Sequence, residues 1–235
     1  KLRLPHDTPV AVSIIDAHSA VLASGVATQG RMVLVMGTST CHLVMDEKEI
    51  FVEGIAGVVR DGILPGYFAY ESGQSAVGDI FEWVTRLGIP KSYYNESKEL
   101  GISIYDLLLK KSVTQKPGQH GLLALDWLNG NRSVLMDSNL SGVLVGLTLN
   151  TNPEDIYRAM IEATAFGTRV IIETYENSGI RIKELYACGG LVENSMLLQI
   201  YSDITGRVIR VAASSQTTAL GAAILGVVAT DSKNG

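Results

Sequence analysis

Two short polar motifs follow apolar runs near the start of the chain. Asp16 follows Val10–Ile15, and Gly37-Thr38-Ser39 follows Met32–Met36. A carboxylate held at a strand end can act as a general base, and glycine with hydroxyl residues lets backbone N–H groups approach an anion. A base beside a phosphate cradle is what phosphoryl transfer needs. Alone, each motif is more often ordinary structure: a helix cap before residues 17–22, and a hairpin turn.

A pair of glycines further along the chain forms a second candidate site. Cys188-Gly189-Gly190 stands between an apolar run and a helical pattern that begins at Asn194. Two glycines there let a flat or anionic ligand lie against the backbone near a helix N-terminus, and the Asn194 amide could bond a purine or ribose. A tight strand-to-helix connection would use the same residues. The chain has neither a P-loop motif nor a Gly-x-Gly-x-x-Gly after a strand.

Candidate sugar contacts gather between Gly66 and Ser75. This stretch mixes aromatic rings with the carboxylate of Glu71, an amide and glycines, and carboxylates and amides can hydrogen-bond vicinal hydroxyls. A loop in which Glu71 and Ser72 cap a helix explains the composition about as well. Further on, Arg132 could meet a phosphate, although a surface ion pair is the default expectation.

The composition argues against several function classes. The net charge of −5 is spread over 235 residues without a basic cluster, so no nucleic-acid surface is expected. No apolar run reaches the ~18–20 residues of a membrane span, and the first residues lack the apolar core of a signal peptide. The two cysteines lie far apart and the four histidines form no paired motif. We therefore expect reduced thiols, no metal site built by the chain, no membrane partner and a cytoplasmic location.

The apolar patterns predict an α/β fold, a mixed β-sheet flanked by helices, in a single domain over residues 1–235. Strands are expected at Val10–Ile15, Met32–Met36, His42–Met45, Ile50–Val52, Gly57–Arg60, Glu184–Ala187 and Arg207–Val211. Helices are expected at Gln74–Arg86, Lys98–Lys110, Asn152–Glu176, Asn194–Thr205 and Thr217–Ala229. The apolar segments at 122–128 and 138–149 are left without a type.

Several segments, taken together, resemble the carboxy-terminal half of the FGGY family of carbohydrate kinases. They follow the order of the family and cover nearly the whole chain: Ile15–His18, Val35–His42, Leu64–Gln74, Gly121–Ser133, Glu162–Gly167, Cys188–Asp203 and Ala219–Ala223. The combination is far more specific than any one motif. The resemblance implies one ribonuclease-H-like lobe of the two-lobed actin-like ATPase fold, with ATP and sugar in the cleft between the lobes.

The resemblance also implies roles for particular residues. Asp16 matches the catalytic base of the family and would contact the sugar substrate, which Glu71 would also reach. Gly37–Ser39 match the motif that binds the terminal phosphates of ATP, which enters with Mg²⁺. Gly189, Gly190 and Asn194 match the residues that contact adenosine, and Gly121 would border the nucleotide.

The first phosphate motif of the family, of the type Asp-x-Gly-Thr, does not precede Asp16. We therefore expect this chain to be the carboxy-terminal nucleotide-binding lobe, with its own amino-terminal lobe as a partner, and to be inactive in isolation. The implied reaction transfers the γ-phosphoryl group of ATP to a ketopentose hydroxyl, and the segment Met36–His42 favours L-ribulose. A kinase for D-ribulose, ribitol, xylulose or glycerol and a non-catalytic nucleotide-binding regulatory module are the alternatives. Association as a homodimer is left open.

Overall fold

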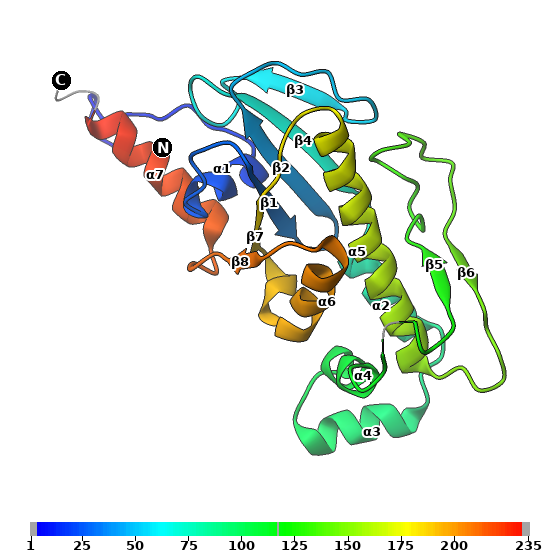
Figure 1. Cartoon of the computed structure of the whole chain (residues 1–235). Helices are drawn as coiled ribbons and strands as arrows, with labels where there is room; N and C mark the ends of the chain where they lie inside the picture. Colours follow the sequence, from blue (N-terminus) through cyan, green and yellow to red (C-terminus); the bar gives the residue numbers. More distant parts are fainter. Residues whose placement is uncertain (1–3, 117, 232–235) are drawn as a thin grey trace.

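The computed structural model describes residues 4–116 and 118–231 (Figure 1). The start of the chain examined for a signal peptide therefore lies partly outside the described residues. A six-stranded mixed sheet runs in the order β3-β4-β2-β1-β7-β8, beside a ribbon formed by β5 and β6. The strands are β1 (Arg31–Met36), β2 (Thr40–Asp46), β3 (Gly57–Arg60), β4 (Phe68–Gln74), β5 (Leu123–Leu125), β6 (Val143–Val145), β7 (Glu184–Cys188) and β8 (Ile209–Val211).

Helices flank the sheet on both faces. They are α1 (Asp16–Ala23), α2 (Gly78–Arg86), α3 (Lys91–Leu100), α4 (Ile104–Ser112), α5 (Pro153–Asn177), α6 (Ser195–Thr205) and α7 (Thr217–Asp231), with a short 3-10 helix η1 (Gly190–Glu193). α1 packs on one face with α7 against it, while α2, α5 and α6 share a core on the other (Figure 1). In the described part of the chain, no helix is both long and apolar enough to cross a membrane.

The central strand β1 is buried on both faces, which explains its continuous apolar run. Met32, Leu34 and Met36 face the core shared with α5, whereas Val33 faces the core shared with α1. β1 is antiparallel to β2 and parallel to β7. Because each fully buried side chain of this size contributes about 1.5–3 kcal/mol, β1 forms a rigid platform for the turns that leave its end.

Two of the predicted strands are wrong. Ile50–Val52 belongs to an irregular connection, and Val10–Ile15 has no strand partner among the described residues. Val10 and Val12 are each 85% exposed. β-branched residues favour a pleated surface only where a neighbouring strand supplies one. Asp16 therefore does not end a strand but is the first residue of α1; the alternative predicted the helix correctly, although the cap position that it gave to Asp16 belongs to Ile15.

The segment from Gly66 to Ser75 is not a loop. Phe68–Gln74 forms β4, which lies between β3 and β2 in the sheet, so Glu71 lies within a strand and does not cap a helix. The next helix begins only at Gly78. Small and polar residues in β4 hide the strand from propensity arguments, because its burial is decided by its neighbours.

The helix predicted over Lys98–Lys110 is divided in two. Gly101 adopts a left-handed conformation with φ of +64° and ends α3, a common helix stop. Ser103 then caps α4 by accepting a hydrogen bond from the Asp106 N–H. The remaining predicted strands and helices are confirmed to within a few residues at each end, and the untyped apolar segments contain the short strands β5 and β6.

Candidate active site

The two glycine-containing motifs meet at one end of the sheet. The pairing of β1 with β2 leaves Gly37–Ser39 as the hairpin turn between them. β7 runs parallel to β1 in a register that pairs Val35 with Cys188, so Gly189 follows beside that turn. The topology thus brings together residues that are about 150 positions apart in the sequence.

The hairpin turn is anchored by the start of α2. Within the turn, the Gly37 N–H donates to the Ser39 carbonyl at 2.9 Å. The N–H groups of Val77 and Gly78 donate to the carbonyls of Thr38 at 2.7 Å and Gly37 at 3.0 Å. These donors stand at a helix start, where backbone N–H groups lack partners within the helix. The turn is therefore fixed from behind, and Thr38 stays exposed at its tip.

The two adjacent glycines after β7 serve different needs. Gly189 has a φ of +100°, and a Cβ there would lie 2.3 Å from the Met36 carbonyl oxygen, so no larger residue fits. A Cβ on Gly190 would meet nothing within 4 Å. Gly189 thus makes the tight strand-to-helix connection that was the alternative interpretation of this motif. The backbone at Gly190, in contrast, is open on its outer side, where a ligand could approach it.

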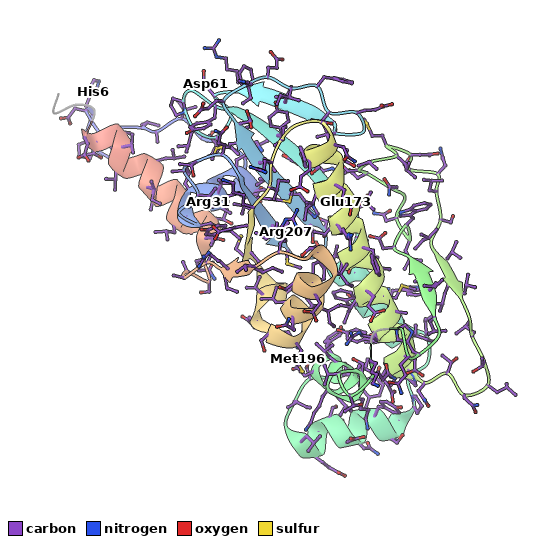
Figure 2. All side chains as sticks on the ribbon, viewed as in Figure 1. His6, Arg31, Asp61, Glu173, Met196 and Arg207 are labelled. Carbon is purple, nitrogen blue, oxygen red and sulfur yellow. The ribbon has the colours of Figure 1, made fainter. Side chains whose placement is uncertain are left out.

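Asn194 joins two helices beside this backbone. Its Oδ1 accepts from the N–H groups of Met196 at 3.1 Å and Leu197 at 3.2 Å, which caps α6. Its Nδ2 donates to Oδ1 of Asp106 in α4 at 2.9 Å. Met196 marks this end of α6 next to α4 in Figure 2. The Asn194 side chain is therefore fixed in orientation by three hydrogen bonds.

A cavity of about 510 Å³ opens between α4, α5 and the start of α6. Its walls mix aromatic and aliphatic side chains with a few polar groups, the composition typical of small-molecule sites. Burial raises the pKa of Tyr157, so its hydroxyl stays neutral. The lining includes Gly78, Tyr105, Asp106, Tyr157, Gly190, Leu191 and Asn194.

Gly121 is not among the residues that line this cavity. It lies just before β5 with a φ of +70°, and its carbonyl faces Gly146, where a Cβ would come within 2.3 Å of it. The structure therefore gives Gly121 a role in the close approach of two chain segments. Its predicted place beside the nucleotide remains a prediction.

A cluster of charged groups connects α1 to the sheet. Asp16 is exposed at the first position of α1, and its carboxylate accepts from the Ala17 N–H at 2.8 Å. Two residues on, His18 Nε2 lies 3.1 Å from Oε2 of Glu71 in β4. Arg132 forms an ion pair with the other oxygen of Glu71. Glu71, His18 and Arg132 thus form one cluster, and Asp16 lies two residues before His18 at the start of α1.

Cys41, the second residue of β2, belongs to the same cluster. Burial raises the pKa of its thiol, and the negative charges of Glu71 and Asp16 raise it further against the opposing effect of Arg132. Burial, the largest single effect, disfavours the charged guanidinium of Arg132, but the hydrogen bond to Glu71, the charge of Glu71 and the neighbouring Cys41 together outweigh it and raise the pKa of Arg132. The cluster therefore contains a neutral thiol and a permanently charged arginine.

Sequence reasoning left three of these partners without a role. His18 was part of a motif only, Asp106 was hidden in a helix predicted as continuous, and Arg132 was considered as a phosphate contact or a surface ion pair, without a partner being named. Only the pattern Ser103-x-x-Asp106, which marks a helix start, could have drawn attention to Asp106. The pairing of Arg132 with Glu71 joins residues 61 positions apart and has no local signal.

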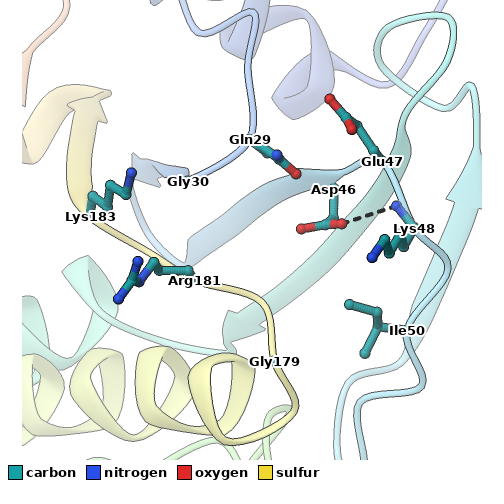
Figure 3. Close-up of a pocket in the computed structure, with 9 residues that line it drawn as sticks. All are labelled: Gln29, Gly30, Asp46, Glu47, Lys48, Ile50, Gly179, Arg181 and Lys183. Atoms are coloured by element: carbon teal, nitrogen blue, oxygen red, sulfur yellow. Dashed lines mark hydrogen bonds between the residues drawn. The ribbon is translucent and has the colours of Figure 1, made fainter.

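A second cavity, of about 470 Å³, lies at the opposite end of the sheet (Figure 3). It lies at the start of β1, the end of β2 and the turn that follows α5. The Asp46 carboxylate accepts from the Lys48 N–H at 3.0 Å, and the other charged side chains come from exposed positions. The lining residues are Gln29, Gly30, Asp46, Glu47, Lys48, Ile50, Gly179, Arg181 and Lys183.

Solved structures of sugar kinases share this fold. A xylulose kinase from Rhodospirillum rubrum superposes with a TM-score of 0.83 over 97% of this chain and 44% of its own, at 22% identity. Plasmodium falciparum glycerol kinase with ADP gives a TM-score of 0.72 over 95% of this chain and 46% of its own, at 20% identity. The predicted fold, a mixed sheet flanked by helices as in one lobe of the actin-like ATPases, is confirmed.

Sequence relatives give the family. The chain is 54% identical over its whole length to the ribulokinase of Halalkalibacterium halodurans and 48% identical to that of Staphylococcus aureus strain MRSA252. It spans 42% and 43% of the length of those two proteins. The model of the FGGY family of carbohydrate kinases, C-terminal domain, matches residues 32–230. The chain therefore belongs to the FGGY family of carbohydrate kinases.

Proposed function

We propose that this chain is the nucleotide-binding part of a kinase that transfers the γ-phosphoryl group of MgATP to a ketopentose, with the 5-hydroxyl of L-ribulose as acceptor. The observation that carries the proposal is the 54% identity to a ribulokinase along the entire chain. The geometry agrees with it, because the hairpin turn and the open backbone at Gly190 lie at one end of the sheet, and Glu71 lies three residues from that end of β4.

The residues at this end fit a nucleotide. The 510 Å³ cavity lies within the ~300–1,000 Å³ range of small-molecule sites, and the open backbone of Gly190 lets a ligand lie close. We assign the adenosine end to Gly190 and Asn194, with Gly189 shaping the connection between them and β1. Thr38 and Ser39 hold the terminal phosphates with backbone N–H and hydroxyl groups, and Gly37, whose N–H closes the turn on the Ser39 carbonyl, lets the phosphates come close to the backbone. Mg²⁺ enters with the nucleotide, as it usually does in kinases.

Asp16 is the proposed general base. MgATP supplies the phosphoryl group, and the Asp16 carboxylate takes the proton from the attacking sugar hydroxyl. Such a base contributes typically ~10²–10⁴-fold to the rate. Its exposed position at the start of α1 leaves the carboxylate accessible, and Glu71 nearby binds other hydroxyls of the same sugar.

The amino-terminal lobe of the whole protein is the proposed partner of the Asp16 face. A hollow of about 350 Å³ lies beside Asp16 and is lined by Val12, Thr218 and Leu225 among others. The outward residues Leu220, Val227 and Val228 of α7 are exposed and apolar, and an apolar surface of this kind marks an interaction site. The relatives are more than twice as long as this chain, so such a lobe is available to cover it.

The experiment is an assay of ADP production by the full-length protein with MgATP and a panel of acceptors. L-ribulose, D-ribulose, ribitol, D-xylulose and glycerol separate the candidate substrates. Turnover that depends on L-ribulose, at least tenfold above the others in kcat/KM, is the expected result. Nucleotide binding without turnover on any acceptor would contradict the kinase and favour a regulatory module.

A further inference from the structure

Glu71 is held at both of its carboxylate oxygens. Oε2 lies 3.1 Å from His18 Nε2, and Oε1 pairs with the Arg132 guanidinium. The two partners come from α1 and from the connection that follows β5, so three distant segments converge on one carboxylate. A carboxylate in an ordinary surface ion pair contacts a single cationic side chain and can still change rotamer. Glu71, in contrast, is only partly exposed and is held by one partner at each of its two oxygens.

The Arg132 guanidinium lies over Gly73 of β4, where a larger side chain would crowd it. A Cβ on Gly73 would lie 3.2 Å from Arg132 Nη1 and 2.7 Å from the Thr40 carbonyl oxygen. The Gly73 N–H donates to Oγ of Ser133, the next residue, at 3.2 Å. The connection that carries Arg132 is therefore docked on β4 at two adjacent points, beside Glu71 itself.

We propose that Arg132 is a positioning residue that orients Glu71 toward the sugar and keeps its carboxylate available as a hydrogen-bond acceptor. The inference rests on the proposed function, in which Glu71 contacts the sugar. A carboxylate offers about four acceptor positions, so the two that are occupied leave others for sugar hydroxyls. A free glutamate would lose rotamer entropy each time it bound a sugar, whereas a clamped one has lost that entropy already on folding.

Arg132 also reaches the phosphate side of the site. Cys41 pairs with Gly73 across β2 and β4, at the glycine over which the Arg132 guanidinium lies, and it follows the hairpin turn Gly37–Ser39 by two residues. Arg132 thus ties the sugar-binding carboxylate of β4 to the strand that carries the phosphate turn. It is occupied by these protein groups, so we assign it to orienting Glu71 and not to binding a phosphate.

The test uses the full-length protein and four variants in the same assay: R132Q, R132K, E71Q and the double variant R132Q/E71Q. We expect R132Q to raise the KM for the sugar about 10–100-fold, the usual range for loss of a charged hydrogen-bond partner, with the KM for ATP within twofold of wild type. R132K keeps the charge without the planar fork, so its effect should be several-fold smaller. The control is R169Q, since Arg169 pairs with Glu173 on the exposed face of α5, and it should change neither KM.

The double variant decides whether Arg132 acts through Glu71. If it does, R132Q should raise the sugar KM less than threefold when Glu71 is already Gln, because the effects of coupled residues do not add. Additive effects, an unchanged sugar KM in R132Q, or a matching rise in the ATP KM would each overturn the inference. If R132Q does not fold, R132K decides by the same two KM values. A wild-type protein that turns over no sugar would overturn the proposed function and this inference together, whereas the other outcomes overturn the inference alone.

Discussion

The two ends of the sheet carry cavities of nearly equal volume and very different chemistry. At the end where β1 and β7 stop, about 510 Å³ lies beside Gly190 and the starts of α2 and α6. At the other end, about 470 Å³ lies beside the start of β1 and the turn that follows α5 (Figure 3). Helix N-termini favour anions and helix C-termini favour cations. Volume alone therefore does not locate a nucleotide site, whereas the direction of strands and helices does.

The side chains at the two ends of the sheet also differ in how firmly they are held in place. At the first end, Asn194 is held by hydrogen bonds to other elements, and three residues in from that end of β4, Glu71 is held by Arg132. At the second end, Lys48, Arg181 and Lys183 are exposed. Functional groups need to be held within a fraction of an ångström of the productive geometry. Only the first end meets this requirement.

The largest expected effect comes from removing the proposed base. Asp16→Asn in the full-length protein should lower kcat about 10²–10⁴-fold, while ADP affinity stays within threefold, because Asp16 is assigned to the sugar hydroxyl. Steady-state kinetics and calorimetric ADP titration measure the two quantities. Normal turnover in this variant would remove Asp16 from the mechanism. Loss of ADP binding together with loss of turnover would show that the substitution disturbs the nucleotide site as well as the base.

Acid should destabilise the folded protein through His42, a buried residue of β2. Its Nε2 lies 3.0 Å from Thr168 Oγ1, and burial, assisted by the charge of Arg132, lowers its pKa from 6.5 to about 3. Between these values the unfolded chain binds a proton that the folded chain does not. The free energy of unfolding should therefore fall as the pH falls from about 6.5 toward 3, by up to about 1.4 kcal/mol per pH unit.

Urea unfolding of wild type and His42→Asn at several pH values between 4 and 7 measures this effect. The variant should lose most of the His42 contribution to the slope while remaining folded at pH 7. Equal slopes in the two proteins would mean that the imidazole is not held neutral. Lys183 at the opposite end of the sheet is exposed, so its substitution should leave the slope of unfolding free energy against pH unchanged.

A matched pair of glycines separates backbone strain from close approach. Gly189 and Gly179 have φ values of +100° and +98°, but a Cβ would lie 2.3 Å from the Met36 carbonyl oxygen at Gly189 and meets nothing within 4 Å at Gly179. Gly179→Ala should cost about 1–2 kcal/mol from strain alone, and Gly189→Ala about 1–3 kcal/mol more. Urea unfolding measures both. Equal losses would show that the junction of β1 and β7 adapts, which would weaken the case for a rigid platform.

The smallest effect is expected at the far end. Arg181→Gln and Lys183→Gln remove exposed charges from the second cavity and should change unfolding free energy by less than about 0.5 kcal/mol. Both KM values and kcat should stay within twofold of wild type. A selective rise in the KM for ATP would contradict the assignment of the two ends, because it would place nucleotide recognition at the end of the sheet where β1 begins.

How much could be predicted from sequence depended on how local the signals were. The long helix α5 was predicted correctly because Asn152, Pro153 and Asp155 mark its start within four residues. β4 was missed because its small and polar residues become a strand only between β3 and β2. Val10–Ile15 was wrongly predicted as a strand, since its composition suits a sheet but the described chain offers it no neighbour.

The candidate site shows the same division. The glycines and Asp16 stand in short motifs that a sequence displays directly. The clamp around Glu71 does not, because His18 and Arg132 lie 53 and 61 positions away from it and carry no local pattern. Long-range pairs of this kind are decided by the topology of the sheet, which one sequence does not reveal.

The most direct test of the account is a crystal structure of the full-length protein with MgADP. We expect nucleotide density at the end where β1 and β7 stop, with the phosphates at Gly37–Ser39 and the adenosine against Gly190 and Asn194. Density in the cavity lined by Lys48 and Lys183, with the first end empty, would contradict it.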